Sequence, residues 1–205
     1  MIHGSRVSVS GLTGGVGAGK STVTSIAEKL GATVVSADEL GHAVYESGTS
    51  EHAAVVEAFG SCAQNPDGSI NRTALGEIVF ADASQLRRLT DIVWPGIRAR
   101  ALEAITEFRI QRPNGVFMLD AALLLEAKWD ELVDQVWVVT ASEDERVLRT
   151  MQRDGVDRNK VSQRMQSQMS EKDRLDAADV ILRNDGDIDE LHHNVARELM
   201  RLGFN

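Results

Sequence analysis

The chain has 205 residues, a formal net charge of −9, 42% hydrophobic residues and one cysteine, Cys62. This length fits a single domain with a sizeable core, and the acidic balance argues against general nucleic-acid binding, which depends on positive charge. No apolar run approaches the roughly 20 residues of a membrane helix, and the first residues show no secretory signal. One cysteine excludes an internal disulfide and favours a reducing compartment, so we expect a cytoplasmic protein that is not in a membrane. No oligomeric state follows from these features.

The first predicted elements are a strand, a glycine-rich loop and a helix. "RVSVSGL" alternates valine with polar residues, which is typical of a strand. A helix with one apolar face is predicted from Lys20 to about Leu30, and Gly31 ends it. "ATVVS" is predicted as a second strand, followed directly by a helix in "ADELGHAVYESG".

The middle of the chain is predicted to be helical. Residues 51–60, 71–80 and 84–93 show helical patterns, "NPDG" forms a turn, and no buried strand is expected between about 40 and 104. Strand patterns return in "GVFMLD", "DQVWVV" and "ADVIL", before a last amphipathic helix over about 188–202. Strands that alternate with helices predict an α/β fold with a doubly wound parallel sheet, interrupted here by a helical insertion.

The loop after the first strand carries the clearest chemical motif. "GGVGAGKS" has the spacing G-x-x-x-x-G-K-S between a strand and a helix, which defines the P-loop. Its backbone N–H groups and the helix N-terminus bind phosphate oxygens. Lys20 is expected to bind the β- and γ-phosphates, and the Ser21 hydroxyl to coordinate Mg²⁺. Thr22 is expected at the α-phosphate or as a helix cap. The predicted ATP-binding residues here are Gly14, Gly15, Val16, Gly17, Ala18, Gly19, Lys20, Ser21 and Thr22.

Other uses of a glycine-rich loop fit less well. A dinucleotide fingerprint starting at Gly15 fails because Lys20 stands where the third glycine belongs. The guanine-selecting motif of GTPases is absent, since "NKVS" has Ser162 in place of its aspartate. ATP is therefore favoured over NAD and GTP, although a purely structural glycine turn remains an alternative.

Two carboxylates follow predicted strands. Asp38 could orient or deprotonate an acceptor hydroxyl, and its alternative role is the N-cap of the following helix. Asp120 could bind Mg²⁺ through water, and its alternatives are a partner for Lys20 or a carboxylate that faces solvent.

A basic segment extends from Arg146 to Arg174, with eight basic and four acidic residues. Arg146, Arg149 and Arg153 are spaced by three and four residues, which places them on one helical face. Such a face can neutralise the charge of a triphosphate. The alternative is that they are surface arginines paired with acidic neighbours, and this is the interpretation we favour for Arg146.

"GLTGGVGAGKST", "ADELG", "NPDGSINRTALGEIVF", "DAALLLEAKW", "RTMQRDG" and "ADVILRNDG" together resemble, in order and spacing, the dephospho-coenzyme A kinase family over about residues 7–199. "TDIVWP" and "RMQSQMS" are most similar to the kinase domain of the animal bifunctional coenzyme A synthase, without its preceding adenylyltransferase domain. The resemblance implies one P-loop kinase domain over 1–205. Its core would comprise 1–39, 114–145 and 178–205, with an acceptor-binding helical insertion over about 40–113 and a helical lid over about 146–177.

The resemblance implies an enzyme that uses ATP and Mg²⁺ to phosphorylate the ribose 3′-hydroxyl of dephospho-coenzyme A, giving coenzyme A and ADP. The implied catalytic residues are Asp38, Lys20 and Arg149. Arg149 would stabilise the transferring phosphoryl group, with Arg153 as its lid partner. Contacts to adenine are implied for Asn184, Asp185 and Gly186, and contacts to the acceptor for Thr13, Asp38, Leu123 and Glu126.

The chain departs from the family pattern at two positions. Ser36 replaces the first aspartate of a D-A-D motif, so the resemblance carries no metal ligand to this position. Trp94 stands where many family members have a histidine before the proline, and this histidine therefore cannot be needed for catalysis here. Pro95 is still expected to break a helix. Two other functions remain open from the sequence: a kinase with a nucleoside or nucleotide acceptor, and an ATP-binding regulator without turnover.

Overall fold

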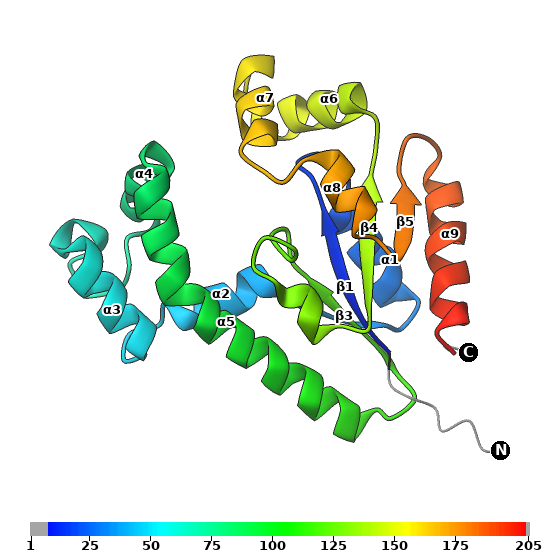
Figure 1. The fold of residues 1–205 in the computed structure, drawn as a ribbon, viewed down its shortest axis with the longest axis horizontal. Helices are drawn as coiled ribbons and strands as arrows, with labels where there is room; N and C mark the ends of the chain where they lie inside the picture. The colour runs from blue at the N-terminus through cyan, green and yellow to red at the C-terminus, as the bar shows by residue number, and fades with distance from the viewer. Residues whose placement is uncertain (1–7, 204–205) are drawn as a thin grey trace. The chain divides into compact units, whose positions relative to one another are not determined.

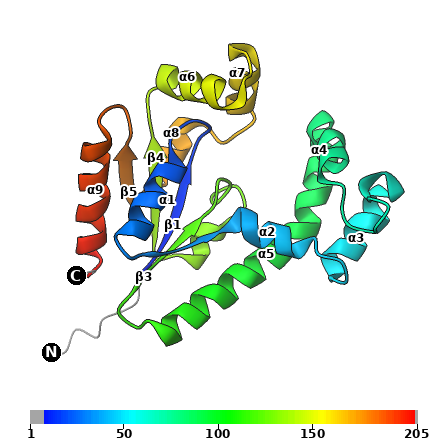
Figure 2. The same ribbon diagram turned by 180° about the vertical axis from the view of Figure 1, so that it is seen from behind.

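The computed structural model describes residues 8–203, and the chain divides into two compact units. The α/β unit comprises the residues up to 35 and those from 105 onward, whereas the helical unit comprises residues 36–104. Figures 1 and 2 show the chain from two opposite sides. Each unit is described by itself below.

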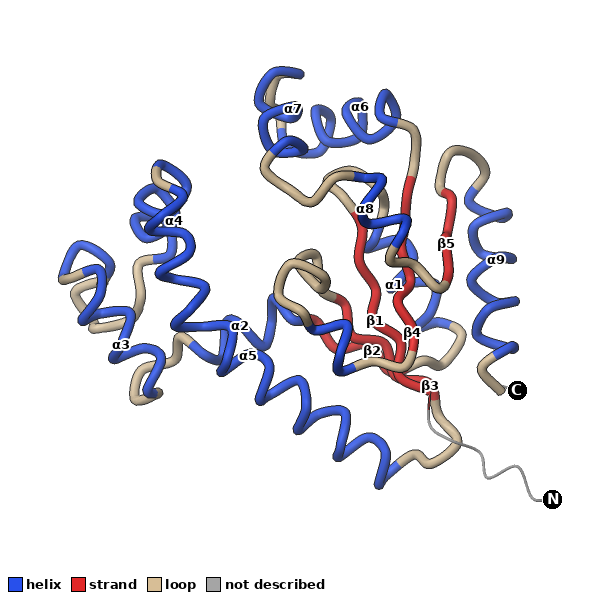
Figure 3. Tube along the Cα trace, viewed as in Figure 1, coloured by secondary structure: helices blue, strands red, loops and turns tan. Residues whose placement is uncertain are grey.

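The α/β unit is organised around a five-stranded sheet with the order β2-β3-β1-β4-β5. β1 pairs in parallel with β3 and β4, and β4 pairs in parallel with β5. Figure 3 shows the strands gathered together, in red. The strands are β1 (Ser8–Gly14), β2 (Thr33–Ser36), β3 (Val116–Asp120), β4 (Gln135–Thr140) and β5 (Val180–Arg183). The predicted parallel α/β sheet is therefore confirmed.

Helices cover both faces of this sheet. On one face, apolar side chains of α1 and α9 pack with Met118, Trp137 and Leu182 of the strands. On the other, Phe108 of α5 meets Phe117 of β3 edge to face, with ring centroids 5.2 Å apart. The elements of this unit other than strands are α1 (Lys20–Lys29), the last turns of α5 (Ala83–Gln111), the 3-10 helix η2 (Trp129–Leu132), α6 (Glu143–Asp154), α7 (Arg158–Gln166), α8 (Glu171–Asp176) and α9 (Ile188–Arg201).

Residue patterns explain why these segments fold as they do. β3 and β4 are nearly continuous apolar runs and are buried along most of their length, as expected for strands covered on both faces. In α9, Leu191, Val195 and Leu199 recur every four residues and are at most 1% exposed. This spacing places them on the stripe that faces the core.

The helical unit contains α2 (Ala37–Val44), α3 (Ser50–Phe59), the 3-10 helix η1 (Ser61–Ala63), α4 (Arg72–Ala81) and the larger part of α5. Side-chain oxygens of Ser36, Thr49 and Asn71 cap α2, α3 and α4. The predicted turn at 65–68 is present: Gly68 has φ 85° and donates its N–H to the carbonyl of Asn65 at 2.9 Å. In the described chain no strand lies between 37 and 104, as predicted.

Pro95 does not break its helix, so that expectation is wrong. α5 runs from Ala83 to Gln111 with Pro95 inside it. A proline removes one backbone hydrogen bond, but Val93 and Ile97 on either side are buried and hold the helix in its core. Of the helices in residues 8–203, none combines the length and apolar character needed to cross a bilayer.

Candidate active site

The predicted P-loop lies between β1 and α1, as its motif requires. Gly17 and Gly19 have φ 76° and 96°, which glycine adopts without strain. Gly19 occupies the N-cap position of α1, and no side chain caps this helix end. The capping alternative for Thr22 is therefore wrong, and the N-terminal N–H groups of α1 form an anion site typical of this motif.

Lys20 is held at the sheet by Asp120. Its ammonium contacts Oδ1 of the carboxylate, and the two side chains are only 19% and 15% exposed. Asp120 ends β3, and Leu12 of β1 is its partner in the sheet register. The proposed alternative of Asp120 as the partner of Lys20 is thus present in the structure.

Gly14, Gly15, Gly17 and Gly19 of the P-loop are all approached so closely that an added Cβ would collide, and polar side chains make the close approach at Gly15 and Gly19. A Cβ at Gly15 would lie 2.2 Å from Nη2 of Arg146 and 3.1 Å from Nη1 of Arg174. A Cβ at Gly19 would lie 2.0 Å from Nδ2 of Asn184. Arginine side chains therefore contact one part of the loop, and an asparagine contacts another.

The arginine contacts depend on a cluster formed by Arg146, Glu171 and Arg174, here called the arginine cluster. Arg146 donates from Nε to the carbonyl of Val16 at 3.0 Å and from Nη1 to Oε2 of Glu171 at 2.7 Å. Arg174 donates from Nη1 to the same oxygen at 3.1 Å. The two arginines are 5% and 1% exposed. One carboxylate thus bridges two buried guanidinium groups beside the P-loop.

The surface interpretation of Arg146 is consequently wrong. Arg146, Val147 and Thr150 form the buried side of α6, and Arg146 reaches the P-loop through its bond to Val16. The three predicted arginines have unequal surroundings. The Arg149 side chain is 32% exposed and lies 3.4 Å from Oε2 of Glu145, while its buried Nη1 has no hydrogen-bond partner.

Arg153 lies at the exposed end of α6. Its side chain is 68% exposed and its Nε is 2.7 Å from Oδ1 of Asp154. Arg164 of α7 approaches the other oxygen of Asp154 at 2.6 Å. Hydrogen bonds from Arg153 and Arg164 hold the pKa of Asp154 below its ordinary value. The three residues connect the end of α6 to α7.

Further contacts join the segment before α8 to the P-loop and to the segment after β3. Oε1 of Gln168 accepts the N–H of Val16 at 3.0 Å. Oε1 of Glu126, a predicted acceptor contact, accepts the N–H of Met169 at 3.3 Å and lies 3.9 Å from Arg174. Leu123, another predicted acceptor contact, is 39% exposed.

Thr13 is fully buried at the end of β1. Its hydroxyl donates to the carbonyl of Ala122 at 3.1 Å. This bond joins β1 to the segment that follows β3. Thr13 therefore positions the start of the P-loop, and its role at the acceptor, which the family resemblance implies, stays a prediction.

The segment after β5 also contacts the P-loop. Nδ2 of Asn184 donates to the carbonyl of Ala18 at 2.9 Å, and Asp185 accepts the N–H of Ser142. Gly186 is exposed. Of the residues predicted to contact adenine, Asn184 thus adjoins the P-loop and Asp185 adjoins the start of α6.

Asp38 belongs to the helical unit, where it is the second residue of α2. Ser36 caps the helix instead, with Oγ accepting the N–H of Glu39 at 3.3 Å, so the N-cap alternative for Asp38 is wrong. Serine serves as an N-cap as well as aspartate does, which gives Ser36 a function of its own. The Asp38 carboxylate is exposed and forms no hydrogen bond or ion pair with any residue in 8–203.

The donors near Lys20 suit Mg²⁺ in a nucleotide complex. Among the described residues no group of three or more histidine, cysteine or carboxylate side chains could hold a metal ion. Mg²⁺ in such complexes needs only one or two protein ligands, because phosphate oxygens and waters complete its shell. The exposed Ser21 hydroxyl follows Lys20 directly, and Lys20 contacts Asp120. The hydroxyl of Ser21 and the carboxylate of Asp120 are oxygen donors of the kind that Mg²⁺ takes, and their binding of the ion stays a prediction.

Two named proteins are similar to this chain in sequence over nearly their whole length. Dephospho-CoA kinase of Geobacter sulfurreducens is 42% identical over 190 residues, which cover 92% of this chain and 95% of that protein. Dephospho-CoA kinase of Geobacter metallireducens is 39% identical over 187 residues, which cover 91% and 92%.

Solved structures are also similar to this chain over nearly their whole length. TT1252 from Thermus thermophilus superposes with a TM-score of 0.81 at 29% identity, covering 96% of this chain and 98% of that chain. Dephospho-CoA kinase from Campylobacter jejuni superposes with a TM-score of 0.71 at 26% identity, covering 95% and 96%. The family model CoaE, dephospho-CoA kinase, matches residues 8–190. The chain therefore has the P-loop kinase fold and belongs to the dephospho-CoA kinase family, which phosphorylates dephospho-CoA with ATP in the final step of CoA biosynthesis.

Proposed function

We propose that this chain transfers the γ-phosphoryl group of ATP to the ribose 3′-hydroxyl of dephospho-coenzyme A, giving coenzyme A and ADP. The observation that carries the proposal is the P-loop whose Lys20 contacts Asp120 and whose Gly15 is contacted by two buried arginines. This arrangement concentrates positive charge where a triphosphate binds. Membership of the kinase family adds the acceptor.

The donor is held by backbone and cationic groups. The N–H groups of Gly14 to Thr22 bind the phosphates, with Lys20 at the β- and γ-phosphates and Arg149 at the transferring group. The unpartnered buried Nη1 of Arg149 supports this role, since it is a donor without an acceptor among the described residues. We place Arg153 over the nucleotide, and Asn184, Asp185 and Gly186 at adenine.

Ser21 and Asp120 hold Mg²⁺ when the nucleotide is bound. The ion supplies neutralisation of the charge on the phosphate oxygens. Lys20 lies against Asp120 and keeps its carboxylate at the P-loop.

Asp38 orients the 3′-hydroxyl and receives its proton. The hydroxyl oxygen forms a bond to the γ-phosphorus as the bond from that phosphorus to the β,γ-bridging oxygen breaks, and ADP leaves with that electron pair. An exposed carboxylate that neither caps α2 nor pairs with a described residue suits this role. Thr13, Leu123 and Glu126 complete the acceptor side in the proposal.

The proposed location is the cytoplasm. Both substrates are charged metabolites, and the product carries a thiol that stays reduced in such a compartment. Cys62, which is free and exposed, is compatible with the same conditions.

The decisive experiment is detection of coenzyme A by mass spectrometry from dephospho-coenzyme A, ATP and Mg²⁺. A parallel panel replaces the acceptor with adenosine or nucleoside monophosphates. The proposal predicts a clear preference for dephospho-coenzyme A. A preference for a nucleoside or nucleotide would refute the acceptor, and ATP binding without any phosphorylated product would indicate a regulator instead.

A further inference from the structure

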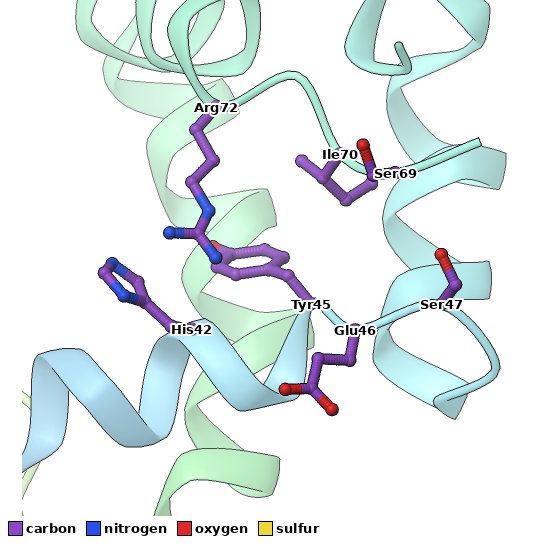
Figure 4. A pocket seen from close by; sticks show the side chains of 7 residues that line it. All are labelled: His42, Tyr45, Glu46, Ser47, Ser69, Ile70 and Arg72. Carbon is purple, nitrogen blue, oxygen red and sulfur yellow. The ribbon is translucent and has the colours of Figure 1, made fainter. Parts of the chain in front are cut away.

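The helical unit contains a cavity that no role described above uses (Figure 4). Its volume is about 400 Å³, and residues from α2, the α2–α3 loop, the loop before α4 and the start of α4 line it. The lining residues are His42, Tyr45, Glu46, Ser47, Ser69, Ile70 and Arg72.

Three donors gather at one end of this cavity. Figure 4 shows the Arg72 guanidinium beside the phenol end of Tyr45, with the His42 ring next to it. Burial raises the pKa of Tyr45 and the charge of Arg72 lowers it by less, so the phenol keeps its proton and can donate a hydrogen bond at neutral pH. Glu46, the one carboxylate of the lining, turns away from the guanidinium.

No carboxylate among the described residues neutralises the charge of Arg72. Within residues 8–203, Arg72 forms no ion pair and no hydrogen bond through its guanidinium, although the arginines of α6 and α8 discussed above all have acidic partners. A guanidinium offers five donors in a planar fork that matches phosphate oxygens. An unpaired guanidinium beside a histidine and a phenol therefore selects an anion.

The cavity also has a fixed place relative to Asp38. Asp38 and His42 are four residues apart on α2 and both are exposed, so they lie on one face about 6 Å apart along the helix. The 3′-hydroxyl and the 5′-diphosphate of dephospho-coenzyme A leave the same ribose ring, and only a few covalent bonds separate them. An acceptor whose 3′-hydroxyl meets Asp38 can thus place its diphosphate one helical turn further along.

We propose that Arg72, His42 and Tyr45 form a subsite for the 5′-diphosphate of the acceptor. The inference rests on the proposed function, in which Asp38 fixes the position of the 3′-hydroxyl. The ligand chemistry is that of a phosphate anion, and free inorganic phosphate is the other possible source. The diphosphate of the acceptor is favoured because the subsite and Asp38 share one helix face.

The test compares Arg72→Met with Arg72→Lys and with Arg87→Met as matched control. Arg87 is an exposed arginine of α5 that does not line the cavity. Arg72→Met should raise KM for dephospho-coenzyme A about 10-fold or more, since it removes hydrogen bonds to a charged group. KM for ATP should stay within about twofold, and Arg72→Lys should recover part of the loss. Arg87→Met should match the unmodified protein.

Direct binding keeps the two hypotheses separate. The Kd of dephospho-coenzyme A is measured by calorimetry without ATP, and Arg72→Met should weaken it by the same factor. If coenzyme A forms but neither KM nor Kd changes, the subsite is refuted while the function stands. If no coenzyme A forms, the function fails, and the Kd alone decides: a weakened value still supports the subsite, and an unchanged value refutes it.

A last arm distinguishes the two phosphate sources. Inorganic phosphate is added at a fixed, subsaturating concentration of dephospho-coenzyme A. If Arg72→Met abolishes an effect of phosphate on the rate but leaves KM for dephospho-coenzyme A unchanged, the cavity binds free phosphate and the proposal is wrong. Simple competition between phosphate and the acceptor, weakened by Arg72→Met, supports it.

Discussion

Nη1 of Arg146 lies 2.7 Å from Oε2 of Glu171, and this pair joins the start of α6 to α8 beside the P-loop. The same oxygen accepts a bond from Arg174, whose side chain is 1% exposed. Two buried positive charges therefore share one carboxylate, and Arg174 has a second, more distant one in Glu126 at 3.9 Å. Burying a charge is costly unless it is paired, so Glu171 has an influence on the P-loop that its position in α8 does not suggest.

Replacing Glu171 by glutamine should lower the free energy of unfolding by about 1–3 kcal/mol, because Arg146 loses its counter-charge and Arg174 loses the nearer of its two. KM for ATP should rise as the two arginines shift at Gly15. Urea denaturation and steady-state kinetics measure the two effects. Asp176→Asn is the control, because its ion pair with Lys172 is exposed and should contribute less than about 1 kcal/mol. If Glu171→Gln and Asp176→Asn changed the unfolding free energy and KM for ATP equally, the contacts of Glu171 with Arg146 and Arg174 would be unimportant.

Local patterns were sufficient to predict much of the fold. Strand alternation, apolar spacing in helices and the P-loop motif each depend on neighbours within a few residues, and the corresponding elements were predicted correctly. The residue that caps α2 was missed because Ser36 and Asp38 are both good caps only two positions apart. The capping bond from Ser36 to Glu39 decides between them in the structure.

Residues whose partners are distant in sequence were not predictable in this way. Arg146 and Val16 are 130 residues apart, and Asn184 and Ala18 are 166 apart. An arginine is usually exposed unless it is paired, so its sequence position alone suggested the surface. Arg174 and Gln168 lie in a basic segment where nothing in the local pattern distinguishes them from exposed neighbours.

Gly19→Ala should damage both stability and nucleotide binding. Gly19 has φ 96°, and its new Cβ would lie 2.0 Å from Nδ2 of Asn184. We expect a loss of about 2 kcal/mol or more in unfolding free energy and a rise in KM for ATP of about 10-fold or more. Thermal or urea unfolding and initial-rate kinetics provide the measurements.

Gly155→Ala separates backbone strain from the close approach of Asn184. Gly155 also has a positive φ, 64°, but nothing lies within 4 Å of the new Cβ. It should cost about 1 kcal/mol of stability and leave KM for ATP unchanged. If Gly155→Ala raised KM for ATP as much as Gly19→Ala does, backbone strain would explain both results. The contact between Asn184 and the P-loop would then have no effect on ATP binding.

Asp120→Asn tests the proposed magnesium ligand. Asparagine keeps the shape of the side chain but removes the charge that Lys20 contacts. The Mg²⁺ concentration for half-maximal rate should rise by about 10-fold, since a hard cation prefers carboxylate to amide oxygen. If only KM for ATP changes while the Mg²⁺ dependence stays the same, Asp120 serves Lys20 alone.

Asp38→Asn should lower kcat by about 100-fold or more, as expected when a general base is lost. The Kd of ATP should remain close to that of the unmodified protein, because the substitution lies in the helical unit and leaves the P-loop intact. Glu39→Gln is the matched control, because Glu39 is the adjacent exposed carboxylate. The substitution keeps the backbone N–H of residue 39, which donates the capping bond to Ser36. Stopped assays for coenzyme A and calorimetry with ATP give both quantities. Normal turnover by Asp38→Asn would remove the proton acceptor from the proposed mechanism, whereas equal losses in the two variants would indicate a general effect of negative charge at the start of α2.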